Sequence, residues 1–338
     1  MVSVRSLLQL LPYAANTGIG SLPHTDVAAA LALSFAHEIP FLPQLPALSR
    51  SEGMIAAGLE GLPGLRCDGK IEVEVWREGR DAFCAAVEAG LSSADLSKLE
   101  PAAHACFEPF LRAVKGGKSS FAKVQIVGPV TARGFAQPSG ALTKGERAEL
   151  DQQIFRLVWA RSLAMVGAVR RTNATPILFL DEPGLVLLDP ADPTPQQAIE
   201  DLKRLIGAVQ QAGALVGIHC CGNTDWATLL RSGLDILSID ARLSLDAVLE
   251  ERTAYLEFIA SGAILALGII PTEASATYLV SELVDSVEVS LRAASPRPLP
   301  GLILTAACGL ATHSVPNAER ILSEVAQAQQ RLRALARP

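Results

Sequence analysis

A histidine and a cysteine two residues apart, His219 and Cys221, are the side chains of this sequence best suited to bind a metal. They follow the short apolar run 214–218, whose length is typical of a β-strand. Alternate side chains of an extended chain share a face, so His219 and Cys221 point the same way and Cys220 points to the opposite face. An imidazole and a thiolate that converge from one strand end supply half of a tetrahedral zinc site.

Two later runs of strand length also end in residues that can bind a metal. Asp240 ends the run 237–240, and Cys308 comes at the end of the run 302–308. Three separate strands therefore end in a nitrogen, sulfur or oxygen ligand, which is a stronger signal than one His-x-Cys pair alone.

The composition indicates a globular chain with an ample core. It has 338 residues, of which 49% are hydrophobic and 19% are charged, enough for one large domain or two small ones. The net charge of −6 and the lack of a Lys/Arg cluster with interleaved aromatic residues argue against nucleic acid as a partner. Disulfides chiefly support small secreted domains, so the six cysteines are expected to be reduced, with packing roles for Cys67, Cys84 and Cys106.

No segment of the sequence predicts membrane insertion. No apolar run reaches the ~18 residues needed to span a bilayer. The Leu-rich run 7–11 faintly imitates a signal peptide, but it is short and suits an amphipathic helix equally well. We therefore expect a cytoplasmic protein with no membrane partner.

From residue 123 onward, short apolar runs alternate with helical stretches. Strands are predicted at 124–127, 176–180, 214–218, 236–239, 263–270 and 302–306. Helices are predicted at 144–172, 195–211, 225–232, 245–261, 277–294 and 315–336. Two earlier strand candidates, at 16–23 and 39–45, flank a helix at 25–37 and bring the strands to eight. This order predicts one α/β domain over residues 1–338, a parallel (β/α)8 TIM barrel.

Residues 46–122 depart from this alternation and are interpreted as a helical insertion between the second and third strands. The polar-apolar alternation at 70–76 predicts an extra strand, and a long helical stretch ends at 115–117.

Polar side chains lie at the carboxyl ends of the predicted strands: Ser21, Gln44, Thr131, Asp181, His219, Cys221, Asp240 and Cys308. In a barrel those ends meet at one face, where active sites are built. A single polar residue at the end of a strand needs no functional explanation, but the whole set favours a functional site.

Six short motifs occur in a fixed order along the chain: IGSLP at 19–23, VGPVT at 127–131, LDEP at 180–183, His-x-Cys at 219–221, SID at 238–240 and CGL at 308–310. With these motifs the chain resembles the carboxyl-terminal catalytic barrel of the cobalamin-independent methionine synthase family. That family shares a barrel superfamily with uroporphyrinogen decarboxylase and the corrinoid-dependent thiol methyltransferases. The resemblance covers almost the whole chain, and its most specific part is the His-x-Cys pair with the distant CGL.

The resemblance implies a role for particular residues. The zinc ligands of the family fall on His219, Cys221 and Cys308, which would be the catalytic centre, and the fourth, carboxylate ligand falls on Asp240, where the family usually has Glu. The family's residues that hold the amino-acid substrate fall on Ser21 and Asp181. Asp181 would bind the amino group of the substrate, and a further substrate-binding position falls near Gln44.

Two departures from the family concern the methyl donor. Methionine synthases of this family are about twice as long, with a duplicated amino-terminal barrel that helps to bind folate. The family also has a His after the seventh strand that assists proton delivery to folate, where this chain has Ile270-Pro271. A corrinoid protein as methyl donor would need neither part, and it is the donor that we expect. His313 could replace the missing proton donor, although a surface or capping role suits it better.

Three hypotheses for the function follow. The leading one is a zinc-dependent methyltransferase that acts on a small thiol, with homocysteine as the expected acceptor and methionine as the product. The second is a lyase of the uroporphyrinogen decarboxylase type, which predicts several arginines in the early loops, but the loop 21–26 has none. The third is a non-catalytic zinc-binding barrel.

Overall fold

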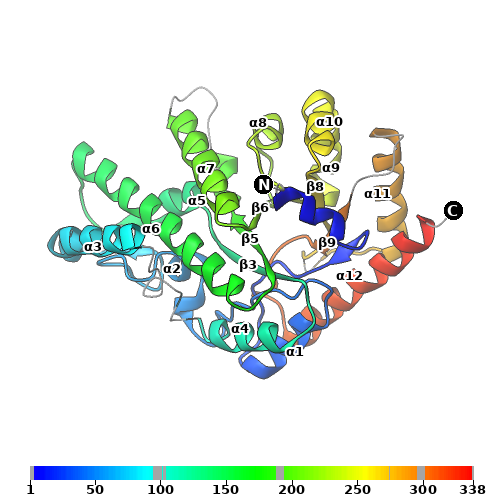
Figure 1. The fold of residues 1–338 in the computed structure, drawn as a ribbon, viewed down its shortest axis with the longest axis horizontal. Coiled ribbons are helices and arrows are strands. Elements are labelled where there is room, and N and C mark those ends of the chain that lie inside the picture. Colours follow the sequence, from blue (N-terminus) through cyan, green and yellow to red (C-terminus); the bar gives the residue numbers. More distant parts are fainter. Residues whose placement is uncertain are drawn as a thin grey trace.

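Seven parallel strands form a curled sheet at the centre of the molecule, with helices around it (Figure 1). The computed structural model describes residues 4–93, 101, 104–187, 194–273, 275–294 and 301–336. The strands are β1 (Ala15–Asn16), β3 (Phe121–Val127), β5 (Thr175–Asp181), β6 (Leu215–Cys220), β7 (Ile236–Asp240), β8 (Ile264–Ile270) and β9 (Leu302–Ala306). Their order in the sheet is β1-β9-β8-β7-β6-β5-β3. The predicted α/β class with a parallel sheet is confirmed.

The segment 39–44 lies where the second strand was predicted. It forms single parallel bridges, from Gln44 to Ser21 and from Phe41 to Lys123, instead of a continuous ladder. The two prolines in the segment lack an N–H group, which explains why no regular ladder forms. Because these bridges join the β1 side of the sheet to β3, the arrangement is consistent with a TIM-like barrel whose second strand is irregular.

Helices surround the sheet: α1 (Val27–Phe35), α5 (Pro129–Phe135), α6 (Lys144–Arg170), α7 (Thr194–Gln211), α8 (Trp226–Leu230), α9 (Ala241–Glu250), α10 (Arg252–Ala260), α11 (Val280–Ala294) and α12 (Val315–Leu335). Of these, α6, α7, α9, α11 and α12 pack directly on its strands. The helix predicted at 245–261 is two helices instead of one. Glu251 separates α9 from α10 with a ψ of 49°, which is outside the helical region.

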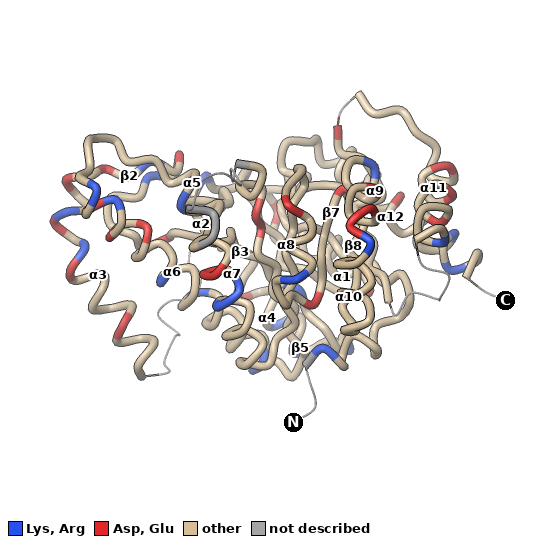
Figure 2. Tube along the Cα trace, turned by 90° about the horizontal axis from the view of Figure 1, so that it is seen from above, with Lys and Arg blue, Asp and Glu red and all other residues tan. Residues whose placement is uncertain are grey.

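Residues between 45 and β3 are mainly helical where the structure describes them. They contain the 3-10 helix η2 (Arg50–Glu52), α2 (Met54–Gly58), β2 (Lys70–Ile71), α3 (Val73–Ser93) and α4 (Phe107–Gly116). α3 lies at one end of the molecule, beyond the strands (Figure 2). Residues 94–100, 102 and 103 of the predicted insertion lie outside the described residues.

The strand predicted at 70–76 is wrong beyond Ile71. Only β2 is extended, and it pairs with β4 (Gln137–Pro138). From Val73 the chain is helical, because Val73, Trp76 and Val87 are buried at helical spacing while Val75 is 47% exposed. The apolar residues fit a period of two over a few positions and the helical period over the longer stretch, and the longer stretch decides the structure.

Alternation along each central strand separates two apolar clusters. In β5, Leu178 and Leu180 pack outward against the helices, and Ile177 and Phe179 pack into the interior of the sheet. Cys220 also belongs to the outer cluster, as the alternation predicts. Apart from Lys123 and Gln125 of β3, the interior is apolar near the amino ends of the strands and polar near their carboxyl ends, so the interior apolar cluster and the polar site share one face of the strands.

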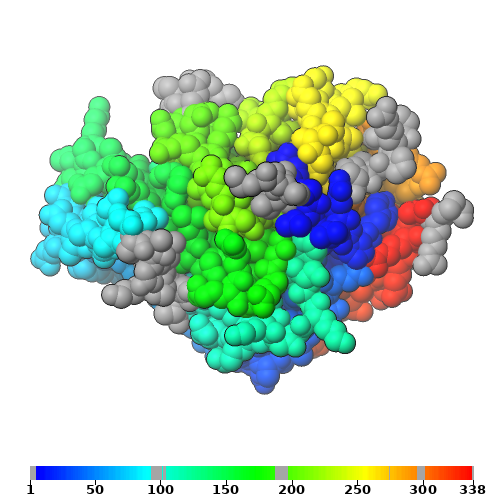
Figure 3. Space-filling model, viewed as in Figure 1, coloured from blue at the N-terminus to red at the C-terminus, as the bar shows by residue number. Residues whose placement is uncertain are grey.

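The 3-10 helix η1 (Val4–Leu10) closes the amino ends of the strands. Leu8 is buried in the interior cluster. Arg5 donates hydrogen bonds to Asp235 at 2.8 Å and to Ser261 at 2.8 Å. In Figure 3 the dark blue segment lies on the surface beside the yellow segment that includes α10. Among the residues that the structure describes, no helix combines the length and the apolar character that crossing a membrane requires.

Candidate metal centre and substrate site

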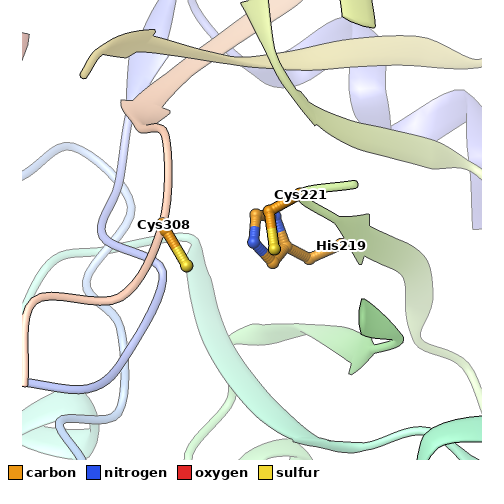
Figure 4. Close-up of side chains that lie close together, drawn as sticks. All are labelled: His219, Cys221 and Cys308. Carbon is orange, nitrogen blue, oxygen red and sulfur yellow. The ribbon is translucent and has the colours of Figure 1, made fainter. Parts of the chain in front are cut away.

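His219, Cys221 and Cys308 meet at the carboxyl end of the sheet. One ligand atom from each residue lies within 4.8 Å of the other two (Figure 4). His219 lies near the end of β6, Cys221 follows that strand, and Cys308 lies two residues beyond the end of β9. The imidazole is buried, and both thiols are partly exposed. In the described part of the chain, this is the one group of His, Cys, Asp and Glu residues arranged closely enough to hold a metal.

Ser238 orients the imidazole of His219. The two residues are paired across β6 and β7, and His219 Nδ1 lies 3.0 Å from Ser238 Oγ. His219 Nε2 is buried and has no hydrogen-bond partner. A metal-binding histidine is arranged in this way, with one ring nitrogen fixed by a neighbouring group and the other free to bind.

The two thiols form a coupled pair. Contacts with Cys308 and His219 lower the pKa of Cys221 to about 4. The hydrogen bond with Cys221 raises the pKa of Cys308 well above the range of a free thiol. Cys221 is therefore the thiol that ionises first, and it supplies an anionic sulfur to the cluster.

This set of donors fits zinc. Two sulfurs and an imidazole nitrogen are ligands that zinc prefers, and its bond lengths place neighbouring ligand atoms roughly 3.3–3.8 Å apart. All three donor atoms lie within 4.8 Å of one another, so closing around a zinc ion requires only small side-chain movements. The fit also explains why a buried nitrogen of His219 has no partner within the protein.

Asp240 is not part of this group of three. It is the last residue of β7, and its Oδ1 accepts hydrogen bonds from the backbone N–H groups of Arg242 and Leu243 at 2.9 and 3.2 Å. The carboxylate is therefore the N-cap of α9. As a fourth metal ligand, Asp240 stays a prediction.

Ser21 and Gln44 lie on the Cys308 side of the site. They form a parallel bridge with each other. The carbonyl of Ser21 accepts a hydrogen bond from the backbone N–H of Leu310 at 2.9 Å. A side chain at Gly309 would collide with the Ser21 hydroxyl, so the turn after Cys308 packs directly against Ser21. Ser21 is thus next to a predicted metal ligand, and Gln44 lies beside Ser21.

Asp181 borders the cluster on its other side. It ends β5 and pairs with His219 across the ladder. Its Oδ1 is buried and has no hydrogen-bond partner. Burial raises the pKa of Asp181 to about 6, against the opposing effects of Lys123 and His219. A buried carboxylate oxygen without a partner is suited to accept a charged hydrogen bond from a ligand amine.

The structure adds site residues to which the sequence analysis gave no role. Glu182 is fully buried and accepts hydrogen bonds from Val130 N at 3.0 Å and from Thr131 N at 2.7 Å and Oγ1 at 2.6 Å. Burial raises the pKa of Glu182 to about 7. It joins the LDEP motif to the VGPVT motif. Ser238 had a detectable signal, because it lies two residues before Asp240 and therefore on the same face of the strand.

Comparison with known proteins supports the fold. No protein-family model matches this sequence, and no curated protein matches it in sequence. A methyltransferase from Methanosarcina mazei has a similar structure, with a TM-score of 0.56 and 13% sequence identity over 96% of this chain and 98% of that chain. A candidate vitamin-B12-independent methionine synthase from Listeria monocytogenes matches with a TM-score of 0.48 and 17% identity, over 68% of this chain and 70% of that chain.

The likeness to the Methanosarcina structure concerns the fold. The chain shares the overall fold of the Methanosarcina methyltransferase over nearly its whole length. At 13% identity a shared fold does not fix the reaction. The reaction depends instead on the side chains at the carboxyl ends of the strands.

Proposed function

We propose that this protein is a zinc-dependent methyltransferase that transfers a methyl group to a small thiol, with homocysteine as the acceptor and methionine as the product. The observation that carries the proposal is the convergence of His219, Cys221 and Cys308 beside the unpaired carboxylate oxygen of Asp181. The fold shared with a methyltransferase and the family resemblance of the sequence motifs support it.

In this proposal the cluster holds the metal. His219 Nε2 and the sulfurs of Cys221 and Cys308 bind zinc, with Asp240 as the fourth ligand. When bound, zinc would lower the pKa of a substrate thiol and so supply a thiolate nucleophile near neutral pH. With zinc on Nε2 the ring proton would be on Nδ1, from which it would donate a hydrogen bond to the Ser238 hydroxyl and hold the orientation of the ring. Cys221, the thiol of lower pKa, needs the least proton release on binding.

Asp181 gives the site its preference for an amino acid. Its buried Oδ1 lies among groups that offer it no hydrogen bond, so the ammonium of homocysteine would satisfy it. A thiol without an amine would leave this oxygen unpaired. Ser21, beside the turn that follows Cys308, and its neighbour Gln44 would hydrogen-bond the remaining polar groups of the amino acid.

The proposed methyl donor is a methylcorrinoid. A folate leaving group needs a proton as the methyl departs, whereas the reduced cobalt of a corrinoid does not. β8 ends in Ile270, and both Ile270 and the following Pro271 are buried and cannot donate a proton. His313, the other residue considered for that role, has its Nδ1 2.7 Å from Asn317 Nδ2 at the start of α12.

The proposal is tested by measuring zinc content and then turnover. Purified protein should contain about one zinc per chain, and the zinc-loaded protein should form methionine from homocysteine. Methylcobalamin, free or on a corrinoid protein, should be a better donor than methyltetrahydrofolate. Cys67→Ser, which removes an exposed cysteine outside the cluster, is the matched control and should retain zinc.

The outcomes separate the hypotheses. A protein that binds no zinc under metal-replete conditions contradicts the proposed centre. Zinc binding with no methionine from any donor would favour a non-catalytic barrel. Faster turnover with the folate donor would refute the corrinoid assignment while leaving the thiol chemistry intact.

A further inference from the structure

Two buried polar residues of β3, Lys123 and Gln125, lie in the interior of the sheet, and the proposed reaction does not use them. Each is 1% exposed. Lys123 Nζ donates hydrogen bonds to the carbonyl of Ile19 at 2.6 Å and to Gln125 Oε1 at 3.1 Å, and it lies 4.8 Å from the centre of the Phe179 ring. A buried ammonium is unfavourable unless such groups satisfy it, so its presence calls for a reason.

The pair is attached to both segments that carry candidate substrate residues. Lys123 binds the carbonyl of Ile19, two residues before Ser21. Gln125 Nε2 donates to the carbonyl of Leu42 at 2.8 Å, two residues before Gln44. The two segments are also joined to each other, because Ser21 and Gln44 form a parallel bridge.

Gly20 shows how closely the first segment fits the pair. Its φ is +147°, and a Cβ at this position would collide with the side-chain amide of Gln125. A side chain at position 20 would therefore displace Gln125 or move the loop that carries Ser21.

The same contacts continue to the metal side of the site. The carbonyl of Ser21 accepts from Leu310 N at 2.9 Å, and the Ser21 hydroxyl occupies the space that a side chain at Gly309 would need. A continuous series of contacts thus runs from Lys123 through Ser21 to the turn that follows Cys308. Burial lowers the pKa of Lys123 to about 8. The negative charge of nearby Asp181 acts in the opposite direction and raises it.

We propose that Lys123 and Gln125 are positioning residues that set the placement of Ser21 and Gln44 relative to Cys308. In this way they determine the affinity of the site for the amino-acid portion of a thiol substrate without touching the substrate. The proposal rests on the proposed function for its substrate. Its structural claim, that the pair holds the two segments and the Cys308 turn together, can be tested without any ligand.

The first test is hydrogen–deuterium exchange of the metal-free protein, followed by mass spectrometry. Lys123→Met and Gln125→Met should each speed exchange roughly tenfold in peptides that contain the backbone N–H groups of Leu22, Gln44 and Leu310. These three groups bond across the two segments and the turn. Peptides from β6 and β7 should be unchanged. Unchanged exchange at all three positions in both variants would overturn the proposal.

The second test separates positioning from general stability. Lys123→Met should raise the KM for homocysteine about tenfold or more, while kcat and zinc content stay within about twofold. Arg161→Met is the matched control, since Arg161 is also a buried cation that holds backbone carbonyls, those of Ala57, Gly58 and Glu60. The control should lower the melting temperature and leave the KM unchanged.

The results distinguish the two proposals. If wild-type protein neither binds nor methylates homocysteine, the proposed function fails, and the exchange experiment still decides the structural claim. If wild-type protein is active and both β3 variants keep its KM, the positioning role is refuted. Should Lys123→Met not fold, Gln125→Met carries both measurements, because it keeps the ammonium and its bond to Ile19.

Discussion

Replacing Ser238 by Ala tests the candidate metal centre without removing any metal ligand. The substitution removes only the hydroxyl that lies 3.0 Å from His219 Nδ1. In the metal-bound state Nε2 must offer its lone pair, so the proton is on Nδ1 and donates to Ser238 Oγ. Without the serine, this buried N–H has no partner in that state.

The expected loss of zinc affinity follows from this geometry. A buried donor left unpaired costs about 1–3 kcal/mol, and loss of a group that orients a metal ligand typically weakens metal binding about 10–100-fold. The metal-free protein is less affected, because the imidazole can then change tautomer or rotate. We expect zinc affinity to fall roughly tenfold to a hundredfold, with little change in fold, since one buried oxygen atom is lost.

Competition with a chromophoric zinc chelator measures this effect. Ser162→Ala is the matched control, because Ser162 is also fully buried and its hydroxyl donates a hydrogen bond to the carbonyl of Val158 within α6. The control should bind zinc as the wild-type protein does. If Ser238→Ala binds zinc within twofold of wild type, Ser238 does not orient a metal-binding His219, and the reasoning is refuted.

Three further predictions concern single residues. Cys308→Ala should lose most of its zinc by elemental analysis while keeping its circular dichroism spectrum, and full zinc occupancy would exclude Cys308 as a ligand. Asp181→Asn should weaken homocysteine binding by ~1.5–3 kcal/mol in calorimetry, because a charged hydrogen bond is lost. Its zinc content should be unchanged. An unchanged affinity for homocysteine would show that the LDEP motif has only a structural role. Burial, with a smaller effect of Arg161, lowers the pKa of His104 from 6.5 to about 4. His104 therefore binds a proton less readily in the folded than in the unfolded state, and the stability of the fold falls as the pH drops from 6.5 toward 4. Denaturant unfolding of His104→Leu at pH 7 and pH 5 should therefore show a smaller acid-induced loss than wild type, by on the order of 1–2 kcal/mol, and equal losses would contradict this role of burial.

The central strands could be predicted from the sequence because their signal is local and strong. The run 214–218 corresponds to β6, and the runs at 236–239, 263–270 and 302–306 correspond to β7, β8 and β9. Continuous apolar runs are what a parallel sheet buried on both faces requires. The residues at 39–45 were harder to predict, because apolar composition favours a strand while two prolines prevent its ladder.

The candidate site could be predicted as far as it depends on strand ends. His219, Cys221 and Cys308 converge because the carboxyl ends of parallel strands meet at one edge. The N-cap role of Asp240 could not be told from a ligand role, since a carboxylate at a strand end suits both. The strand was predicted to begin at Val124, one residue after Lys123, whereas Lys123 lies in the ladder of β3 with Ile177 as its partner.

On the interior face of the strands, the residues that stabilise the fold and the residues of the candidate site form two successive layers. In the apolar layer Phe179 packs against Gly217, where a Cβ would lie 2.6 Å from its ring, and this layer closes the centre of the sheet. Two residues further along the same strands, the interior positions are Asp181 and His219, which border the candidate site. The apolar layer stabilises the fold whichever polar residues follow it, so a fold shared at 13% identity is compatible with many reactions. The side chains of the next layer decide the reaction, and here they are an oriented imidazole, two thiols and an unpaired carboxylate oxygen.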